Sequence, residues 1–394
     1  MSNPFTTHGR EALIVEALRT PMGKSNAERG WYRDTHPNEM LGSVYTALLE
    51  RTGLPASAVE DLIIGCTAPF GEQSRNIGRN AWLQAGYPVE VPATVLDRRC
   101  GSAQTAVEMA AALIASGTHD IAIAGGVEHM DHVPMNSPAK ISELYGEPWP
   151  PALRERFAFV NQGESAELIA DQWGITRQHM DDFAVLSHQR AADAVAQGRF
   201  DREMIPLHLA GETRSSDQTI RPGTTAETLG GLKTVFRQDN GRVTAGSASP
   251  ISDGAAGLLL ASRDATERHG LVPRARILDQ TTVGVDPIMM LTGPIPATRK
   301  LLERNAMTIN DIDLIEINEA FSSVVLAWEQ ELKPDMDRVN VNGGAIALGH
   351  PVGATGSRLF ATLLAEMERR DVEIGLVTMC CGGGLGTATL IQRV

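Results

Sequence analysis

Cys100 stands where a cysteine can act as a nucleophile. It lies in the segment LDRRCGSAQ, between residues 93–96, which predict a strand, and residues 102–116, an Ala-rich stretch that predicts a helix. A thiol at a helix N-terminus is close to the positive end of the helix dipole, which favours the thiolate. Gly101 permits a sharp turn and the close approach of a substrate. A buried structural cysteine is the alternative interpretation.

His350 lies in GGAIALGHPVGATG, a glycine-rich turn that leads into a predicted helix at residues 353–369. A neighbouring imidazole is a common means of activating a thiol. The alternatives are a histidine bonded to the backbone of a tight turn, or a phosphate-binding loop. The spacing of Gly349, Gly353 and Gly356 fits neither the Walker pattern nor GxGxxG, so the phosphate loop is not favoured.

Cys380 follows an apolar segment at residues 372–379 and comes shortly before three glycines. The backbone N–H groups of such glycines can face a developing oxyanion. A simple strand exit and a redox pair with Cys381 are the alternatives, although the strain of a disulfide between adjacent residues argues against the pair. Together with Cys66 these cysteines form no CxxC spacing, so no metal site is expected.

The elements that must position these side chains follow one order twice. The expected strands are residues 12–16, 62–65, 93–96 and 120–126, then 275–278, 313–318, 339–341, 372–379 and 387–391. The expected helices are residues 39–51, 75–84 and 102–116, then 297–304, 321–331 and 353–369. Cys66 and Asn318 end equivalent strands 252 residues apart, and Gly126 and Met379 are 253 apart. This pattern indicates an internal duplication, with largely parallel strands covered by helices on both faces. It also predicts that the helix N-termini after Cys100 and His350 meet across a pseudo-twofold axis.

Residues 127–250 have a different character. They contain Pro-rich stretches, a predicted helix at 163–172 and a longer one at 177–197, with Thr176 as its N-cap. We interpret this region as an insertion that forms a lid or a cofactor-binding wall. The expected domains are a first core half (residues 1–126 plus 251–272), an inserted loop domain (127–250) and a second core half (273–394).

The composition excludes several classes of function. A net charge of −13 argues against a general nucleic-acid or anionic-membrane partner. The N-terminal residues lack the features of a signal peptide, and no apolar run approaches the ~20 residues that cross a bilayer. We therefore expect a cytoplasmic protein with no membrane association.

Four ordered motifs resemble the thiolase family along nearly the whole chain. They are CGS at Cys100, NEAF at Asn318–Phe321, GGAIALGHPVGATG at Gly343–Gly356 and CxGGG from Cys380. EALRTPMGK near the start and TAGSASPISDGAA at residues 244–256 also resemble thiolase segments. The resemblance implies an α/β fold of duplicated βαβαβαββ halves, with a five-layer α-β-α-β-α core and an inserted loop domain.

The same resemblance implies a role for each site residue. Cys100 carries the acyl group, His350 activates it, and Cys380 is the acid/base at the acetyl α-carbon. Asn318 holds a water that forms one oxyanion hole with His350, and the backbone N–H groups of Cys100 and Gly382 form the other. Cys380 is chosen over its neighbour because the family spacing is CxGGG. Further residues match positions on the coenzyme A path, namely Ser249 and Arg221.

The substrate follows from finer resemblances. GGVEHMDHVPM is similar to bacterial fatty-acid β-oxidation thiolases, and GEQSRNIGRNAWLQAG to actinobacterial thiolases of steroid degradation. Asn161 stands where some short-chain thiolases have a histidine near the pantetheine, which weakens a biosynthetic role. The resemblance thus implies thiolysis of a medium, long or bulky 3-ketoacyl-CoA, with coenzyme A as substrate and no permanently bound cofactor. It also implies a homodimer or homotetramer.

Three alternatives remain open at this point. Acetoacetyl-CoA synthesis by an acetyl-CoA C-acetyltransferase uses the same residues. A ketoacyl synthase that uses acyl carrier protein shares the duplicated fold, but it usually pairs its cysteine with two histidines or with His and Asn. A non-catalytic acyl-CoA-binding scaffold would not need Cys100, His350, Cys380 and Asn318, all of which are present.

Overall fold

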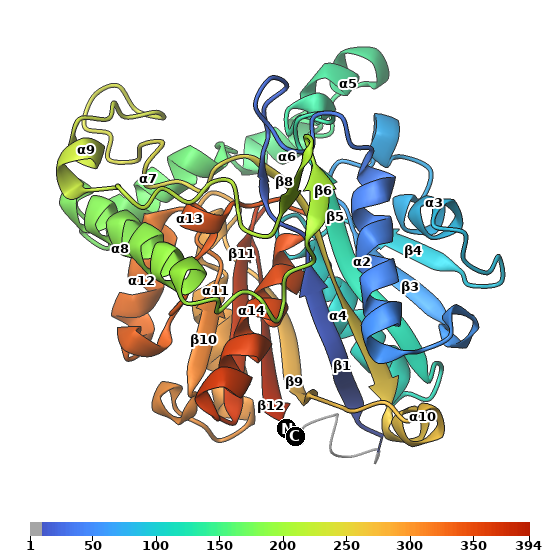
Figure 1. Cartoon of the computed structure of the whole chain (residues 1–394). Coiled ribbons are helices and arrows are strands. Elements are labelled where there is room, and N and C mark those ends of the chain that lie inside the picture. The colour runs from blue at the N-terminus through green and yellow to red at the C-terminus, as the bar shows by residue number, and fades with distance from the viewer. Residues whose placement is uncertain (1–9) are drawn as a thin grey trace.

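The strands of the two halves are arranged in the same order. The structure is a computed structural model that describes residues 10–394 (Figure 1). The first half has the strands β1 (Ala12–Arg19), β3 (Asp61–Gly65), β4 (Ala93–Leu96), β5 (Ile121–His129) and β8 (Ser252–Ser262), in the order β1-β8-β5-β3-β4. The second has β9 (Ala275–Gly284), β10 (Leu314–Ile317), β11 (Ile374–Cys381) and β12 (Leu385–Arg393), in the order β9-β12-β11-β10. In each half the inner pairs β3–β5 and β10–β11 are parallel, whereas β8 and β12 run antiparallel to both neighbours. The predicted duplication is therefore confirmed.

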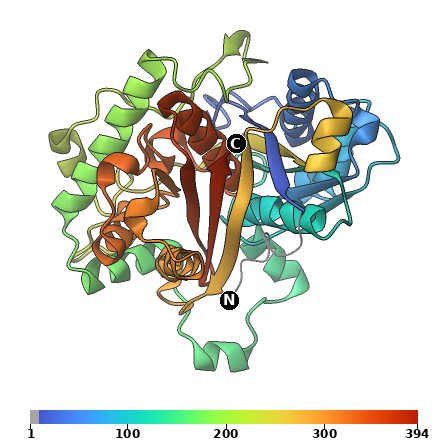
Figure 2. The same ribbon diagram turned by 90° about the horizontal axis from the view of Figure 1, so that it is seen from below.

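The two half-sheets join at one short edge. β1 pairs with β9 only at Leu13–Arg276 and Ile14–Ala275, and β9 lies between β12 and β1 in the view from below (Figure 2). The short strand β2 (Gly23–Lys24) pairs with β8, and β6 (Leu207–Leu209) forms a separate hairpin with β7 (Glu212–Arg214). The sheet is continuous, so the expected domain boundaries stay a prediction. The first nine residues of the expected first half lie outside the described residues.

Three clusters of buried residues lie between the five layers of the core, one in the middle and one on each outer side. The helices α4 (Ser102–Ala115) and α14 (Thr355–Arg370) lie between the half-sheets and share one cluster with strands of both. The helices α2 (Pro37–Thr52) and α3 (Ile77–Gln84) cover the outer face of the first half. The helices α11 (Pro294–Arg304) and α12 (Ser322–Leu332) cover the outer face of the second. The predicted α-β-α-β-α core is confirmed.

Glycines allow the two inner helices to approach closely at their N-termini. A Cβ on Gly356 of α14 would lie 2.2 Å from the Gln104 backbone nitrogen of α4. A Cβ on Gly126 of β5 would lie 1.9 Å from the carbonyl oxygen of Gly353. Neither position accepts a side chain without movement of backbone. The predicted meeting of the helices that follow Cys100 and His350 is confirmed.

One predicted strand is wrong. Residues 339–341 contribute a single parallel bridge, between Val339 and Ile315, in place of a strand. Asn340 has a φ of 45°, which ends extended structure. Its side chain accepts from the Ile317 N–H and donates to the Ile317 carbonyl, both at 2.9 Å. The side-chain amide thus replaces the backbone ladder that a strand would supply.

The helices α7 (Gln162–Gln172) and α8 (Arg177–Ala196) of the inserted region pack on the second half of the core, whereas Ile205 and Leu209 pack on the first half. Both helices contact α12, and α8 also contacts α13 (Ala345–Leu348), as Figure 1 shows. Thr176 Oγ1 accepts from the His179 N–H at 3.1 Å, so the predicted N-cap is confirmed. The remaining helices are α5 (Ser137–Tyr145), α6 (Pro151–Arg156), α9 (Ala226–Gly230) and α10 (Arg263–His269).

Candidate functional site

Cys100 lies at the end of a tight turn between β4 and α4. Arg99 has a φ of 52°, and its N–H donates to Asp97 Oδ1 at 2.7 Å, which folds the chain back so that Cys100 is only 2% exposed. Burial raises the pKa of the Cys100 thiol to about 11, although hydrogen bonds from the N–H groups of Gly382 and of Cys100 itself lower it. Desolvation thus raises the pKa of this thiol more than the nearby backbone donors lower it, so the sulfur needs a base to become a thiolate. At neutral pH the sulfur carries its proton.

His350 lies between α13 and α14 with both ring nitrogens directed at buried groups. Thr355 Oγ1 donates to the Pro351 carbonyl at 2.8 Å, so at 2.6 Å from His350 Nδ1 it must accept the Nδ1–H. This assignment leaves Nε2 unprotonated, with a lone pair that faces Asn318 Nδ2 at 3.4 Å and can take a proton during the reaction. Burial, and then the positive charge of Arg358, lower the pKa of His350 to about 3, so the imidazole is neutral at neutral pH.

Asn318 connects His350 to Cys380. It follows β10, and its Nδ2 lies 3.4 Å from His350 Nε2. Burial, and then the neighbouring Cys100, raise the pKa of Cys380 well above its usual range, although a hydrogen bond from the Asn318 side chain lowers it. Asn318 Oδ1 is buried and has no hydrogen-bond partner within residues 10–394. The structure therefore gathers Cys100, His350, Cys380 and Asn318 in one place.

Cys380 and Cys381 face opposite sides of β11. Cys381 points into the middle layer, where a Cβ on Gly101 would lie 2.6 Å from its sulfur. Cys380 belongs to a cluster on the outer side, together with Ala320 and Phe321 of the NEAF segment. Of the two, only Cys380 has Asn318 among the groups that act on its thiol. Asn318 thus lies beside Cys380, the cysteine that the family spacing favours, and the choice between the two cysteines stays a prediction.

The glycine turn between β11 and β12 directs a donor at Cys100. Gly383 and Gly384 have φ values of 86° and 83°, a conformation that glycine adopts without strain. The turn places the Gly382 N–H against the Cys100 sulfur, where it stabilises the thiolate. The backbone donors of Cys100 and Gly382 therefore converge on the same sulfur.

A cavity of about 300 Å³ borders the chain segments next to these groups, although Cys100, His350, Cys380 and Asn318 themselves do not line it. Its lining includes Gly382, Val352 next to the His350 turn, and Asn161 from the N-terminus of α7. The other walls are mostly apolar, and among them Trp149 and Phe159 stack with ring centroids 4.9 Å apart. The cavity connects the catalytic turn with the inserted region.

Ser249 and Arg221 do not line this cavity. The Ser249 N–H donates to the Ala320 carbonyl at 3.0 Å, which places this half-buried residue against the NEAF segment. Arg221 is exposed on a loop beside α8, where its N–H donates to His188 Nδ1 at 3.2 Å. Their assignment to the coenzyme A path stays a prediction.

Glu128 and Thr355 support the site and were missed by sequence reasoning. The buried Glu128 carboxylate accepts from the N–H groups of Thr67, Ala68 and Gly353 at 2.9–3.1 Å, and so joins a cavity wall to the turn after His350. In the sequence, Glu128 stands in GGVEHM, a segment that indicates only a family resemblance. These partners of Glu128 lie 60 to 225 residues away, so no local pattern marks them, whereas those of Thr355 are only four and five residues before it.

Models of a known family match both halves of the chain. The model of the thiolase N-terminal domain matches residues 12–264, and that of the thiolase C-terminal domain matches residues 271–393. The chain belongs to the thiolase family. It is 43% identical to a steroid 3-ketoacyl-CoA thiolase of Mycobacterium tuberculosis, covering 99% of this chain and 97% of the relative. It is also 43% identical to a 3-ketoacyl-CoA thiolase of Colwellia psychrerythraea, covering 98% of this chain and 100% of the relative.

A solved structure gives the same picture of the fold. The crystal structure of Bacillus anthracis acetyl-CoA acetyltransferase superposes with a TM-score of 0.89 at 35% identity, covering 98% of this thiolase and 99% of that chain. Within residues 10–394 no cluster of three or more His, Cys, Asp or Glu is arranged to hold a metal ion. Across the same residues, every helix is too short or too polar to span a bilayer.

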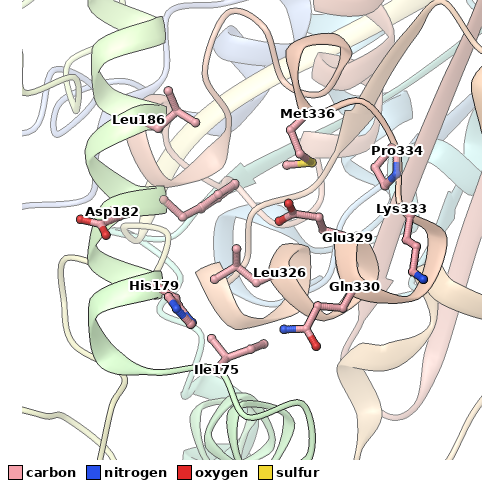
Figure 3. Close-up of a pocket in the computed structure, with 11 residues that line it drawn as sticks. Ile175, His179, Asp182, Leu186, Leu326, Glu329, Gln330, Lys333, Pro334 and Met336 are labelled. Atoms are coloured by element: carbon pink, nitrogen blue, oxygen red, sulfur yellow. The ribbon is translucent and has the colours of Figure 1, made fainter.

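A second cavity, of about 850 Å³, lies away from the candidate site. It opens between α8 and α12, where Leu186 and Leu326 form apolar walls and the Glu329 carboxylate points inward (Figure 3). None of the predicted site residues lines it. Its size alone does not connect it to the chemistry of Cys100.

Proposed function

We propose that this thiolase cleaves a 3-ketoacyl-CoA with coenzyme A, giving acetyl-CoA and an acyl-CoA shortened by two carbons. The observation that carries the proposal is the placement of two buried thiols and a neutral imidazole around Asn318. Each group has the protonation state that the reaction requires of it. The two relatives named as 3-ketoacyl-CoA thiolases support the degradative direction.

The first step forms a covalent acyl-enzyme. His350 Nε2 takes the proton of Cys100, whose sulfur attacks the 3-keto carbon. The N–H groups of Cys100 and Gly382, which already converge on that sulfur, stabilise the resulting oxyanion. Removing one such donor typically costs about 3–4 kcal/mol of transition-state stabilisation.

The second step breaks the carbon–carbon bond. The tetrahedral adduct collapses, the acyl group stays on Cys100, and the electron pair of the bond leaves on the acetyl-CoA enolate. The His350 Nε2–H, now a donor, and a water held by Asn318 Oδ1 stabilise the enolate oxygen. Cys380 then gives its proton to the α-carbon, and its raised pKa keeps that proton in place until the enolate forms.

The last step returns the enzyme to its resting state. The Cys380 thiolate takes the proton of incoming coenzyme A, whose sulfur attacks the thioester on Cys100. The Cys100 thiolate leaves and recovers its proton from His350. Protons and electron pairs thus balance over the cycle without a permanently bound cofactor.

The apolar walls of the cavity favour an acyl group larger than acetyl. The cavity is lined by Trp149, Phe159 and Asn161. Asn161 stands where some short-chain thiolases that this segment resembles have a histidine. This supports a medium, long or bulky substrate over acetoacetyl-CoA. We also propose that the enzyme is cytoplasmic and acts as a homodimer or homotetramer, with residues 127–250 as its loop domain. Ser249 and Arg221 are assigned to the coenzyme A path.

The experiment mixes purified protein with 3-ketoacyl-CoA esters of short, long and steroidal acyl groups, with and without coenzyme A. Acetyl-CoA should form only with both substrates present, and faster with the larger esters. Failure to release acetyl-CoA from any ester would refute thiolysis. Preference for acetoacetyl-CoA would favour an acetyltransferase. Transfer only to acyl carrier protein would favour a ketoacyl synthase, and binding without turnover would favour a scaffold.

A further inference from the structure

Gln104 lies where α4, which follows Cys100, packs on β11, which carries Cys380, and on the neighbouring strand β12. Its side chain is fully buried between α4 and the second half-sheet. Nε2 donates to the Val377 carbonyl at 3.1 Å and to Thr389 Oγ1 at 2.9 Å, and Oε1 accepts from Thr387 Oγ1 at 2.7 Å. Three hydrogen bonds of one amide therefore join α4 to β11 and β12.

The backbone of the same residue meets α14. Gly356 approaches so closely that a Cβ there would lie 2.2 Å from the Gln104 nitrogen and 2.9 Å from its Cβ. Gly356 is six residues after His350. Gln104 thus contacts α14, the helix that follows His350. Its side chain is hydrogen-bonded to β11, which carries Cys380, and to β12.

Gln104 and its partner Val377 are each close in sequence to one of the two cysteines. Cys100 is one helical turn before Gln104, and Cys380 is three residues after Val377 on β11. The segments between them are short and regular, so a shift of α4 against β11 moves one sulfur relative to the other. Nothing in the sequence around Gln104 indicated this role, because its partners lie 273 to 285 residues away.

We propose that Gln104 is a positioning residue that sets the separation of the Cys100 and Cys380 sulfurs, a proposal that rests on the proposed thiolysis. It touches no reacting atom. It acts by fixing the start of α4 on β11 and β12, so that the acyl group on one sulfur stays within reach of the proton on the other. A displacement of about 1 Å in such a geometry can cost about 10²-fold in rate.

The central test is Gln104→Leu, which replaces the amide with an apolar side chain of similar size and removes all three hydrogen bonds. The kcat for thiolysis should fall about 30- to 100-fold, with KM for the acyl-CoA changed less than about threefold. Alkylation of Cys100 by iodoacetamide needs only one sulfur, and its rate should stay within about threefold of wild type. Equal losses in kcat and alkylation would show a disordered helix start and overturn the proposal, as would an unchanged kcat.

Gln104→Glu adds a readout that a general loss of packing would not produce. A protonated carboxyl can still donate one hydrogen bond and accept another, whereas a carboxylate would face the oxygens of Val377 and Thr389. Burial raises the pKa of a carboxyl, so the acid form gains population as pH falls. Glu108 accepts from the same Thr389 hydroxyl at 3.1 Å, and burial raises its pKa to about 8, so the comparison is made as a ratio to wild type, in which Glu108 is also present. The kcat of this variant relative to wild type should rise from pH 9 to pH 6, while the Gln104→Leu ratio stays flat. A flat Gln104→Glu ratio would contradict the role.

Gln280→Leu is the matched control. Gln280 also anchors α4, since its Nε2 donates to the Glu108 carbonyl at 2.7 Å, but it does so farther along the helix than Gln104. Its loss should leave kcat within about twofold, and a loss equal to that of Gln104→Leu would overturn the proposal.

If Gln104→Leu does not fold, Thr387→Val removes one of the three hydrogen bonds and should give a smaller loss of kcat in the same direction; no loss in that variant would count against the role. Wild-type protein that releases no acetyl-CoA would refute the proposed function, a result distinct from any of these.

Discussion

Replacing Thr355 with valine tests how His350 is held in its reactive tautomer. The change keeps the branched shape but removes the oxygen that accepts the His350 Nδ1–H at 2.6 Å. The buried donor is then left without a partner, a loss of about 1–3 kcal/mol. The loss is greater when the imidazole is charged, because charged donors form hydrogen bonds about twice as strong. The proposed transition state contains that charge, and the resting site does not.

The expected effect is therefore on rate. Only the extra loss in the transition state lowers the rate, and because the charged donor's hydrogen bond is about twice as strong, that extra loss is about 1–3 kcal/mol. It corresponds to a fall in kcat/KM of about 5- to 150-fold, since about 1.4 kcal/mol is tenfold. The assay is acetyl-CoA release at subsaturating 3-ketoacyl-CoA. Thr362→Val is the control, because Thr362 is a buried hydroxyl on the same helix that donates to Glu203 at 2.9 Å, away from the imidazole. A change of less than about twofold in Thr355→Val, or an equal loss in the control, would refute the assignment.

Three further predictions address the thiols and the packing around them. Because burial raises the pKa of Cys100 to about 11, its alkylation rate should rise about tenfold per pH unit from pH 7 to 9, and a plateau beginning below pH 8 would contradict this. Cys380→Ser should slow acetyl-CoA release at least tenfold more than Cys381→Ser; comparable losses would reverse the choice between them. Gly356→Ala should lower the free energy of unfolding by about 1–3 kcal/mol in urea titrations, because its Cβ would meet Gln104. A stabilisation, as alanine gives in an open helix, would show that the two helices do not meet there.

The residues that carry the chemistry were predictable because each stands beside a turn that the sequence itself marks. Cys100, His350 and Cys380 are each followed by a glycine within three residues. The duplication then predicted that the helices after the first two meet, and Gly126 and Gly356 show the close approach that this requires. Local patterns and one long repeat were sufficient for the layers and the strand order.

The remaining features depend on contacts between residues far apart in the sequence. Asn340 ended a predicted strand by bonding Ile317 with its side chain, and no propensity indicates that. Glu128 binds the N–H of Gly353 across 225 residues. The helix dipole suggested a thiolate at Cys100, but the degree of burial that raises its pKa exists only once the layers have packed. Sequence reasoning therefore found the groups but not their protonation states or supports.

The central claim is that Cys100 carries the acyl group during the reaction. The direct measurement is to mix the protein with a 3-ketoacyl-CoA in the absence of free coenzyme A, quench with acid, digest with trypsin and analyse the peptides by mass spectrometry. Cleavage after Arg99 separates the Cys100 peptide from the one that holds Cys380 and Cys381. We expect the mass of the shortened acyl group on the Cys100 peptide, with one equivalent of acetyl-CoA released. An acyl group on the other peptide, or acetyl-CoA released with no acyl-enzyme, would contradict the account.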